Sequence, residues 1–424
     1  MDYNSLLLRL GLDPSNFVNK ANEPIKTEKG FIYEVDQTHA KVPCPFCKSE
    51  RIYVKGYFTS EINCSETNQI TDTLRVRKIR FKCRECDKTF TPCLNGIEPY
   101  AKTSDQTRQL IYNEFTNKIT FSDIAKRYGL STNRIMQIFD DRIKHVPRRS
   151  LPEVLCIDEI KFETDVDRKY ACILYDFKKR EIVDIIISRQ MPYLREYFNS
   201  ISIPELNKVK IIISDMYDGY ASIAHRYFKN AVHVVDMFHV IRLLTSAINT
   251  VRVRAMNGLE DKASLEYNFM KKNWKLFLCR HQKIPDKYYA YKKTGELFHY
   301  DYLLNRCIRQ NSSLWTSYNT LQDMFRYDAK FTFDEALVFL KRISDNLINC
   351  ESPIVREVGR SYHKWRFEIA TAFSKTQNNI RYNNGVAETI NNHIKSITKA
   401  AYGYRNFDRF RKRAMLIITY SKPS

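Results

Sequence analysis

The sequence predicts a multidomain α/β protein in which two small N-terminal domains precede a larger core of strands and helices. The chain has 424 residues, of which 43% are hydrophobic, and this is enough for one large core with one or two smaller ones. Paired cysteines occur near its start, and short β-branched runs between 151 and 240 give way to a long helical stretch. We divide the chain into five predicted regions, which are residues 1–100, 101–150, 151–240, 241–375 and 376–424.

The formal net charge is +21 at pH 7, which predicts a polyanionic partner, most commonly nucleic acid. Charge alone leaves open a basic enzyme with no such partner. No stretch of the sequence is apolar over the roughly 18 residues that a membrane span needs, and the start lacks the basic segment of a signal peptide. We therefore expect a cytoplasmic protein that acts at the nucleoid, makes no membrane contact and keeps its eleven cysteines reduced.

Two CxxC pairs in the first region, Cys44 with Cys47 and Cys83 with Cys86, predict a structural zinc ion. One CxxC turn brings two thiolates near a single ion, and two such turns complete a tetrahedral four-cysteine site. Lysines and arginines surround both pairs, which is typical of a zinc ribbon that contacts the DNA backbone. A redox pair or a chance pairing is the alternative interpretation.

Residues 121–141 have the spacing of a helix-turn-helix. Gly129 falls where the tight turn needs a positive φ angle, and the apolar residues after it recur at positions that pack a second helix on the first. An ordinary helical hairpin in a core is the alternative. The second helix exposes residue types that contact base edges and phosphates in a major groove, and we expect DNA contacts from Thr132, Asn133, Arg134 and Gln137.

Two aspartates fall on strand-like runs of the third region. Asp158 lies within the run from 154 to 162, and Asp215 ends an apolar run after a predicted helix. Taken alone, either aspartate is typical of a turn or a helix cap. Their order is more informative, because three strands, a helix, two further strands and a late helical glutamate form the layout of an RNase H-like fold. In that fold the carboxylates hold two divalent ions about 3.5–4 Å apart, and oxygen ligands favour Mg²⁺ or Mn²⁺.

The third carboxylate is predicted at Glu388, on the helix that follows the turn at 383–385. Glu388 lies off the apolar stripe of this helix, on a face that also carries Asn391 and later amides and lysines. Such a face suits a metal ligand followed by a DNA backbone. We therefore predict DNA contacts from Asn392, Lys395, Lys399 and Arg405.

Other interpretations of this region remain open. A solvated amphipathic helix would also place a glutamate near its N-terminus, and the region after 350 offers three more candidates, namely Glu351, Glu357 and Glu368. Basic residues near the end of the chain are expected to extend the positive surface, with only Asp408 to offset them. They are Arg409, Arg411, Lys412 and Arg413.

These motifs together resemble the ISL3 family of bacterial insertion-sequence transposases. The matching stretches are CPFC, CREC, the helix-turn-helix, CIDEIKF, ISDMYDGY, VDMFHVIRL and GVAETINNHIKSITKAAYGYRNF. The resemblance implies a DDE transposase whose triad is Asp158, Asp215 and Glu388. The sequence departs from the family at Thr389, where the family usually carries glycine.

The run from Asp236 to His239 is similar to a [CD]-x-x-H motif that several DDE families carry before a helical insertion. We predict that Asp236 and His239 support the site by orienting a DNA phosphate or a carboxylate. A capped helix with a partly buried histidine fits the run equally well. The helical insertion then comprises residues 241–375, between the two parts of the RNase H-like core.

The expected function is that of a DDE transposase. It would bind the terminal inverted repeats of an insertion sequence and catalyse metal-dependent strand cleavage and strand transfer into target DNA. Two Mg²⁺ or Mn²⁺ ions per active site, one structural Zn²⁺ and a homodimer or larger assembly are implied. The main alternative is an inactive or domesticated regulator that binds DNA through its zinc ribbon and helix-turn-helix without cutting. Another RNase H-like nuclease is a second alternative, and a tyrosine recombinase fits least.

Overall fold

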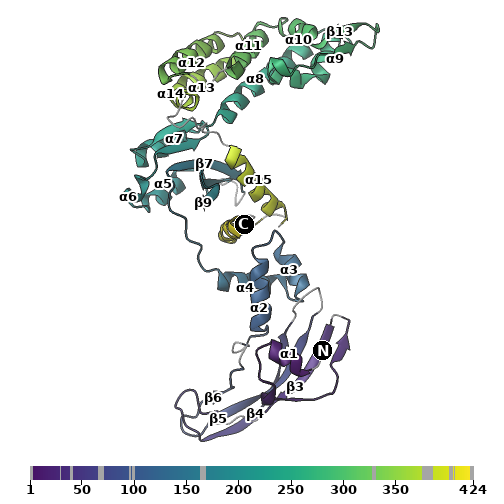
Figure 1. Ribbon diagram of the computed structural model, residues 1–424, viewed down its shortest axis with the longest axis vertical. Coiled ribbons are helices and arrows are strands. Elements are labelled where there is room, and N and C mark those ends of the chain that lie inside the picture. The colour runs from purple at the N-terminus through teal and green to yellow at the C-terminus, as the bar shows by residue number, and fades with distance from the viewer. Residues whose placement is uncertain are drawn as a thin grey trace. The chain divides into compact units, whose positions relative to one another are not determined.

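The chain forms two compact units in the computed structural model, one made of residues 1–147 and 392–424 and the other of residues 148–391. Figure 1 labels many of the elements of both units. Among the described helices, none combines the length and the apolar character that a membrane span requires. The structure describes residues 3–28, 30–38, 42–64, 71–94, 97, 101–162, 169–326, 331–374, 385–400, 404 and 406–420, without the side chains of 326, 385–390, 400 and 420.

A six-stranded sheet forms the N-terminal part of the first unit. Its strands are β1 (Phe17–Asn19), β2 (Ile25–Thr27), β3 (Gly30–Gln37), β4 (Ile52–Asn63), β5 (Thr73–Cys83) and β6 (Thr89–Phe90). The order is β1-β3-β5-β4, with β2 on β3 and β6 on β5. β3 and β5 are parallel, and the other pairs are antiparallel. Helix α1 (Tyr3–Arg9) packs Leu6 and Leu7 against Val35 and Leu74 of this sheet.

Three short helices follow, α2 (Asp105–Glu114), α3 (Phe121–Arg127) and α4 (Thr132–Arg142). Each begins after a capping side chain, because Ser104, Thr120 and Ser131 accept a hydrogen bond from a backbone N–H in the first turn. Gly129, between α3 and α4, has the positive φ angle of 61° that the tight turn requires. A fourth helix, α16 (Phe407–Tyr420), packs Leu416 against the core of these three.

The second unit contains a mixed five-stranded sheet. Its strands are β7 (Val154–Lys161), β8 (Tyr170–Asp176), β9 (Glu181–Ile186), β10 (Ile211–Ser214) and β11 (Val232–Val235), in the order β11-β10-β7-β8-β9. β7, β8 and β9 are antiparallel neighbours, whereas β10 is parallel to both β7 and β11. Helices α5 (Met191–Asn199), α6 (Ile203–Leu206) and α7 (Asp218–Tyr227) share a hydrophobic core with one face of the sheet.

Helices dominate the chain after β11, and Figure 1 shows them gathered together. They are α8 (Met237–Gly258), α9 (Leu265–Lys272), α10 (Tyr300–Ile308), α11 (Ser312–Arg326), α12 (Phe333–Ile348), α13 (Pro353–Lys364) and α14 (Arg366–Phe373). A small hairpin of β12 (Tyr288–Ala290) and β13 (Leu297–His299) lies among them in the sequence. One hydrophobic core joins these helices through residues such as Leu244, Leu304 and Leu340. Helix α15 (Gly385–Ala400) follows, and the boundary between the two units falls within it.

The structure confirms the expected mixed α/β, multidomain class. The five-stranded sheet has the strand succession that the sequence predicts, with the first strand at its centre, and it is consistent with an RNase H-like core. The division into five regions remains a prediction.

Candidate active site

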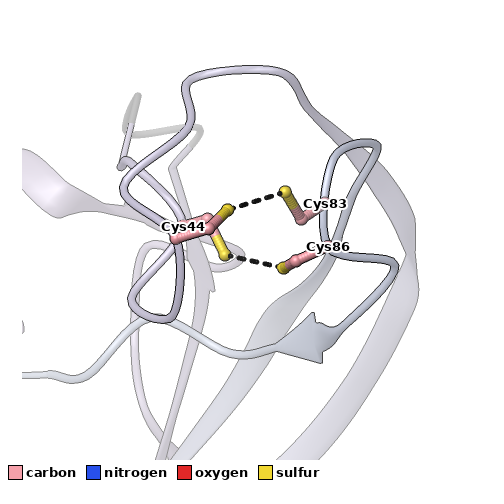
Figure 2. A group of neighbouring side chains, drawn as sticks. Cys44, Cys83 and Cys86 are labelled. Atoms are coloured by element: carbon pink, nitrogen blue, oxygen red, sulfur yellow. Dashed lines mark hydrogen bonds between the residues drawn. The ribbon is translucent and has the colours of Figure 1, made fainter.

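Four cysteine thiols converge in the first unit. The Sγ atoms of Cys44, Cys47, Cys83 and Cys86 all lie within 4.8 Å of one another. The distance is 3.6 Å between Cys44 and Cys86 and 3.5 Å between Cys47 and Cys83. Figure 2 shows the labelled thiols pointing toward the centre of the group from two loops.

The two CxxC loops repeat one local conformation. The residue after each pair, Lys48 or Asp87, has a positive φ angle, 62° and 58° respectively. The backbone N–H of Cys86 lowers the pKa of the Cys83 thiol, which favours the thiolate that binds metal. The cluster therefore has the arrangement that the sequence predicts, and it can hold a zinc ion.

The helix-turn-helix residues selected from the sequence all lie on α4. Asn133 and Gln137 are exposed, whereas Thr132 and Arg134 are partly buried. Arg134 donates a hydrogen bond from its side chain to Gln137 Oε1 at 3.4 Å. The four side chains are thus available on one helix, and their contact with DNA remains a prediction.

Asp158 is a buried carboxylate on the central strand of the second unit, with 7% of its surface exposed. Alternation along β7 places Asp158 on the opposite face from Leu155 and Ile157, which pack against α5 and α7. Its Oδ1 accepts the backbone N–H of Glu159 at 2.8 Å, and its Oδ2 accepts the side-chain N–H of Asn391 at 2.7 Å. Burial raises the pKa of Asp158.

Asp215 follows β10, which is the parallel neighbour of β7. Ile213 pairs with Cys156 in the register, so two residues further along each strand the register brings Asp215 beside Asp158. Burial, followed by the negative charge of Glu159, raises the pKa of Asp215 to about 6. Its Oδ1 is buried and has no hydrogen-bond partner among the described residues.

Asp236 and His239 lie at the start of α8, directly after β11. Asp236 is only 1% exposed, and it caps the helix by accepting the backbone N–H of Phe238 at 3.2 Å. The Nε2 atom of His239 is 3.7 Å from Asp236 Oδ2. The charge of His239 lowers the pKa of both Asp158 and Asp215 against the larger effect of burial. The structure therefore brings these two residues to the predicted carboxylates, and their role there remains a prediction.

Asn391 lies one helical turn after Glu388, on the helix face that the sequence assigned to the metal ligand and DNA, but its contact with Asp158 was not predicted. Its amide nitrogen donates to Asp158, while its Oδ1 is buried without a hydrogen-bond partner among the described residues. The three-residue spacing from Glu388 was the sequence signal that indicated a shared face.

Glu159 and Arg189 form a second feature that the sequence did not reveal. Glu159 pairs with Arg189, and the guanidinium of Arg189 lies 4.8 Å and 4.9 Å from the ring centroids of Tyr170 and Tyr217. These charges affect Asp215 in opposite directions, because Glu159 raises its pKa and Arg189 lowers it. No motif or spacing connected Arg189 with β7.

The structure describes only the backbone of the predicted third carboxylate residue, Glu388. The backbone of Glu388 belongs to α15, but its side chain lies outside the described residues, as does the whole of Arg405. Asn392, Lys395 and Lys399 are exposed on the same helix. Ile394 and Ile397 are buried, as expected for the apolar stripe.

The expectation that the basic residues near the end of the chain extend a positive surface is wrong for three of them. Arg413 is only 1% exposed, Arg409 pairs with Asp140, and Lys412 pairs with Asp408. The sequence spacing did not reveal that α16 packs against other helices and uses these side chains in the contacts.

The pair formed by Asp158 and Asp215 fits a divalent cation. Burial and nearby negative charge both disfavour the ionised carboxylates, so a bound cation would stabilise them. The Oδ1 of Asp215, which has no hydrogen-bond partner within the described part of the chain, could serve as a ligand. Oxygen ligands favour Mg²⁺ or Mn²⁺ over zinc.

Comparison with known proteins identifies the family of the chain. A family model described as a transposase, that of the ISL3 DDE transposases, matches residues 155–414. The chain is similar to the transposase for insertion sequence element IS1001 of Bordetella parapertussis, with 21% identity over 342 residues, which cover 80% of this chain and 79% of that protein. The chain is also similar to a protein of Lactococcus lactis subsp. lactis named ATP-dependent protease. The two are 28% identical over 114 residues, which cover 27% of this chain and 34% of that protein. The family model spans more than half of the sequence, from β7 to α16, and the chain therefore belongs to the ISL3 family of DDE transposases.

Proposed function

We propose that this transposase binds the terminal inverted repeats of its insertion sequence, cuts the DNA there and joins it to target DNA. The family implies a DNA substrate and the use of divalent metal. The observation that carries the chemical part is the placement of a partly buried Asp215 beside the buried Asp158, where loss of solvation raises the pKa of both carboxyls. Placing two ionised carboxylates side by side away from water is unfavourable in free energy, and a bound cation would offset that cost.

Asp158, Asp215 and Glu388 would hold two Mg²⁺ or Mn²⁺ ions. Such ions, when bound, would activate a water or a DNA 3′-hydroxyl and would stabilise the leaving oxygen. Within the chain, the Asn391 amide fixes the orientation of the Asp158 carboxylate through its 2.7 Å hydrogen bond. Asp236 and His239 hold the start of α8 beside the site, since the Asp236 carboxylate caps the helix.

DNA recognition is assigned to the first unit and to α15. Asn133 and Gln137 are exposed on α4, where a recognition helix presents residues to the major groove. Asn392, Lys395 and Lys399 are exposed on α15 and suit a phosphate backbone, to which we also assign Arg405.

The hairpin of β4 and β5 adds a basic surface beside the cysteine cluster. Arg77 lies 4.4 Å from the Tyr57 ring centroid, and Arg84 lies 5.3 Å from that of Tyr53. Rings that restrain arginines in this way support phosphate contact. We assign the cluster itself to structural zinc.

Transposition joins two DNA ends, so we propose that two or more copies of the chain act together. Mass photometry with and without DNA carrying two inverted repeats tests this. A homodimer or larger complex is expected with the DNA, and a monomer on paired ends would contradict it.

The direct test of the chemistry is cleavage of labelled DNA carrying an inverted-repeat end, with and without Mg²⁺ or Mn²⁺. Cleavage is expected only with metal, and Asp215→Asn should reduce it by orders of magnitude while DNA binding survives. Asp218→Asn is the matched control, because this exposed aspartate lies at the start of α7, three residues after Asp215. Full cleavage by the Asp215 variant, or cleavage in EDTA, would contradict the proposal. An inactive regulator would bind the same DNA and never cut it.

A further inference from the structure

Helix α16 is built into the helix-turn-helix domain, although its first residue, Phe407, comes 265 residues after Arg142, the last residue of α4. Phe410 and Ala414 are fully buried, and Leu416 packs against the core formed by α2, α3 and α4. The contacts of its basic side chains are therefore internal contacts of this helical domain.

Arg413 is buried in the same domain. Its Nη2 donates hydrogen bonds of 2.9 Å to the carbonyl oxygens of Asn117 and Ile119, in the loop between α2 and α3. Its guanidinium lies 5.6 Å and 5.0 Å from the ring centroids of Phe115 and Phe121. With 1% exposure, this arginine has no surface to offer DNA, and its position indicates that α16 holds the domain together.

Arg409 makes a contact with α4 itself. Its Nε lies 3.0 Å from both carboxylate oxygens of Asp140, its Nη2 lies 2.6 Å from Oδ2, and its Nη1 lies 3.3 Å from Met136 Sδ. Asp140 stands three residues after Gln137, and Met136 stands three residues after Asn133, so both border the face of α4 that is assigned to DNA. Each end of the guanidinium and its Nε already has a partner on α4.

We propose that α16 is a structural helix of the end-binding domain and that Arg409 is a positioning residue, which holds α4 in the orientation that reads the DNA end. This rests on the proposed function of α4. The connection through residues 401–406 is short, so the helix that carries Glu388 is followed almost at once by the helix that orients α4.

The test uses the full chain and a fluorescein-labelled duplex copied from the end of the insertion sequence that encodes it. A scrambled duplex of equal length measures binding without sequence preference. The variants are Asp140→Asn, Arg409→Gln and the exchanged pair Asp140→Arg with Arg409→Asp. Arg360→Gln is the control, because it breaks an exposed ion pair with Glu357 on α13.

Asp140→Asn and Arg409→Gln are each expected to bind the end duplex roughly tenfold more weakly, with unchanged binding to the scrambled duplex. The exchanged pair should recover most of this loss in affinity. The salt dependence should stay that of the wild type. A residue that touches phosphate would instead weaken binding to both duplexes and reduce the salt slope by about one, and this result would overturn the positioning role. The positioning role would also be overturned if Asp140→Asn and Arg409→Gln kept the full preference for the end duplex, or if the exchanged pair recovered none of the lost affinity. If the wild-type chain itself shows no preference, the proposed function of α4 fails instead.

Discussion

Replacing Asn391 by leucine tests the electrostatic organisation of the candidate active site. The substitution keeps the approximate size of the side chain and removes the N–H that lies 2.7 Å from Asp158 Oδ2. A hydrogen bond to a charged group contributes about 1.5–3 kcal/mol, and partners that orient metal ligands change affinity by roughly 10- to 100-fold. We therefore expect Mn²⁺ to bind Asn391→Leu about 10- to 100-fold more weakly.

Isothermal titration of Mn²⁺ into the DNA-free protein measures this effect without relying on catalysis. Ser396→Ala is the control, because Ser396 is exposed on the same helix and lies outside the proposed site. Thermal melting of both variants in EDTA shows whether the fold is intact. Wild-type Mn²⁺ affinity in a folded Asn391→Leu protein would refute the inference that the amide orients Asp158 for metal.

Three further predictions concern the cysteine cluster, Asp215 and α4. Elemental analysis of protein purified without chelators should find about one zinc per chain, and Cys83→Ser should lose it; a zinc-free wild type would contradict the assignment. The raised pKa of Asp215, about 6 against an ordinary value of 3.8, means that the metal-free folded state holds this proton more tightly than the unfolded state. Its contribution to stability is therefore present below pH 3.8 and is lost as the pH rises to about 6, by on the order of 3 kcal/mol. Melting curves in EDTA should accordingly show wild type losing stability relative to Asp215→Asn over this range, and parallel curves would refute the shift. Arg134→Ala should weaken binding to the end duplex by roughly 1–3 kcal/mol if Arg134 reads a base, and unchanged affinity in a fluorescence titration would exclude that contact.

Local patterns in the sequence predicted several parts of the structure because they depend on near neighbours. The CxxC pairs give the same turn twice, with Lys48 and Asp87 in the left-handed conformation, and the paired strands bring the turns together. Gly129 and the cap at Ser131 define the turn before α4 in the same local way. Asp158 of β7 and Asp215, directly after β10, were predicted to lie together because the order of strands fixes which of them are neighbours.

Local sequence patterns did not predict the contacts between segments that lie far apart in the chain. Arg413 appeared to be one of several exposed basic residues, and only the packing of α16 on α2 to α4 shows that it is buried. Alternation along β7 separated Asp158 from Glu159, yet the charge of Glu159 raises the pKa of Asp215 more than that of Asp158 does. This ordering depends on three-dimensional distances at the ends of two strands, which alternation does not provide.

Metal-dependent cleavage of the labelled end duplex by Glu388→Gln and Glu368→Gln tests the central claim most directly. Both changes remove one negative charge, but only Glu388 is assigned to the metal site with Asp158 and Asp215. We predict that Glu388→Gln binds the duplex and cleaves it slower by orders of magnitude, whereas Glu368→Gln cleaves at the wild-type rate. Normal cleavage by Glu388→Gln together with a dead Glu368→Gln would contradict the three-carboxylate site.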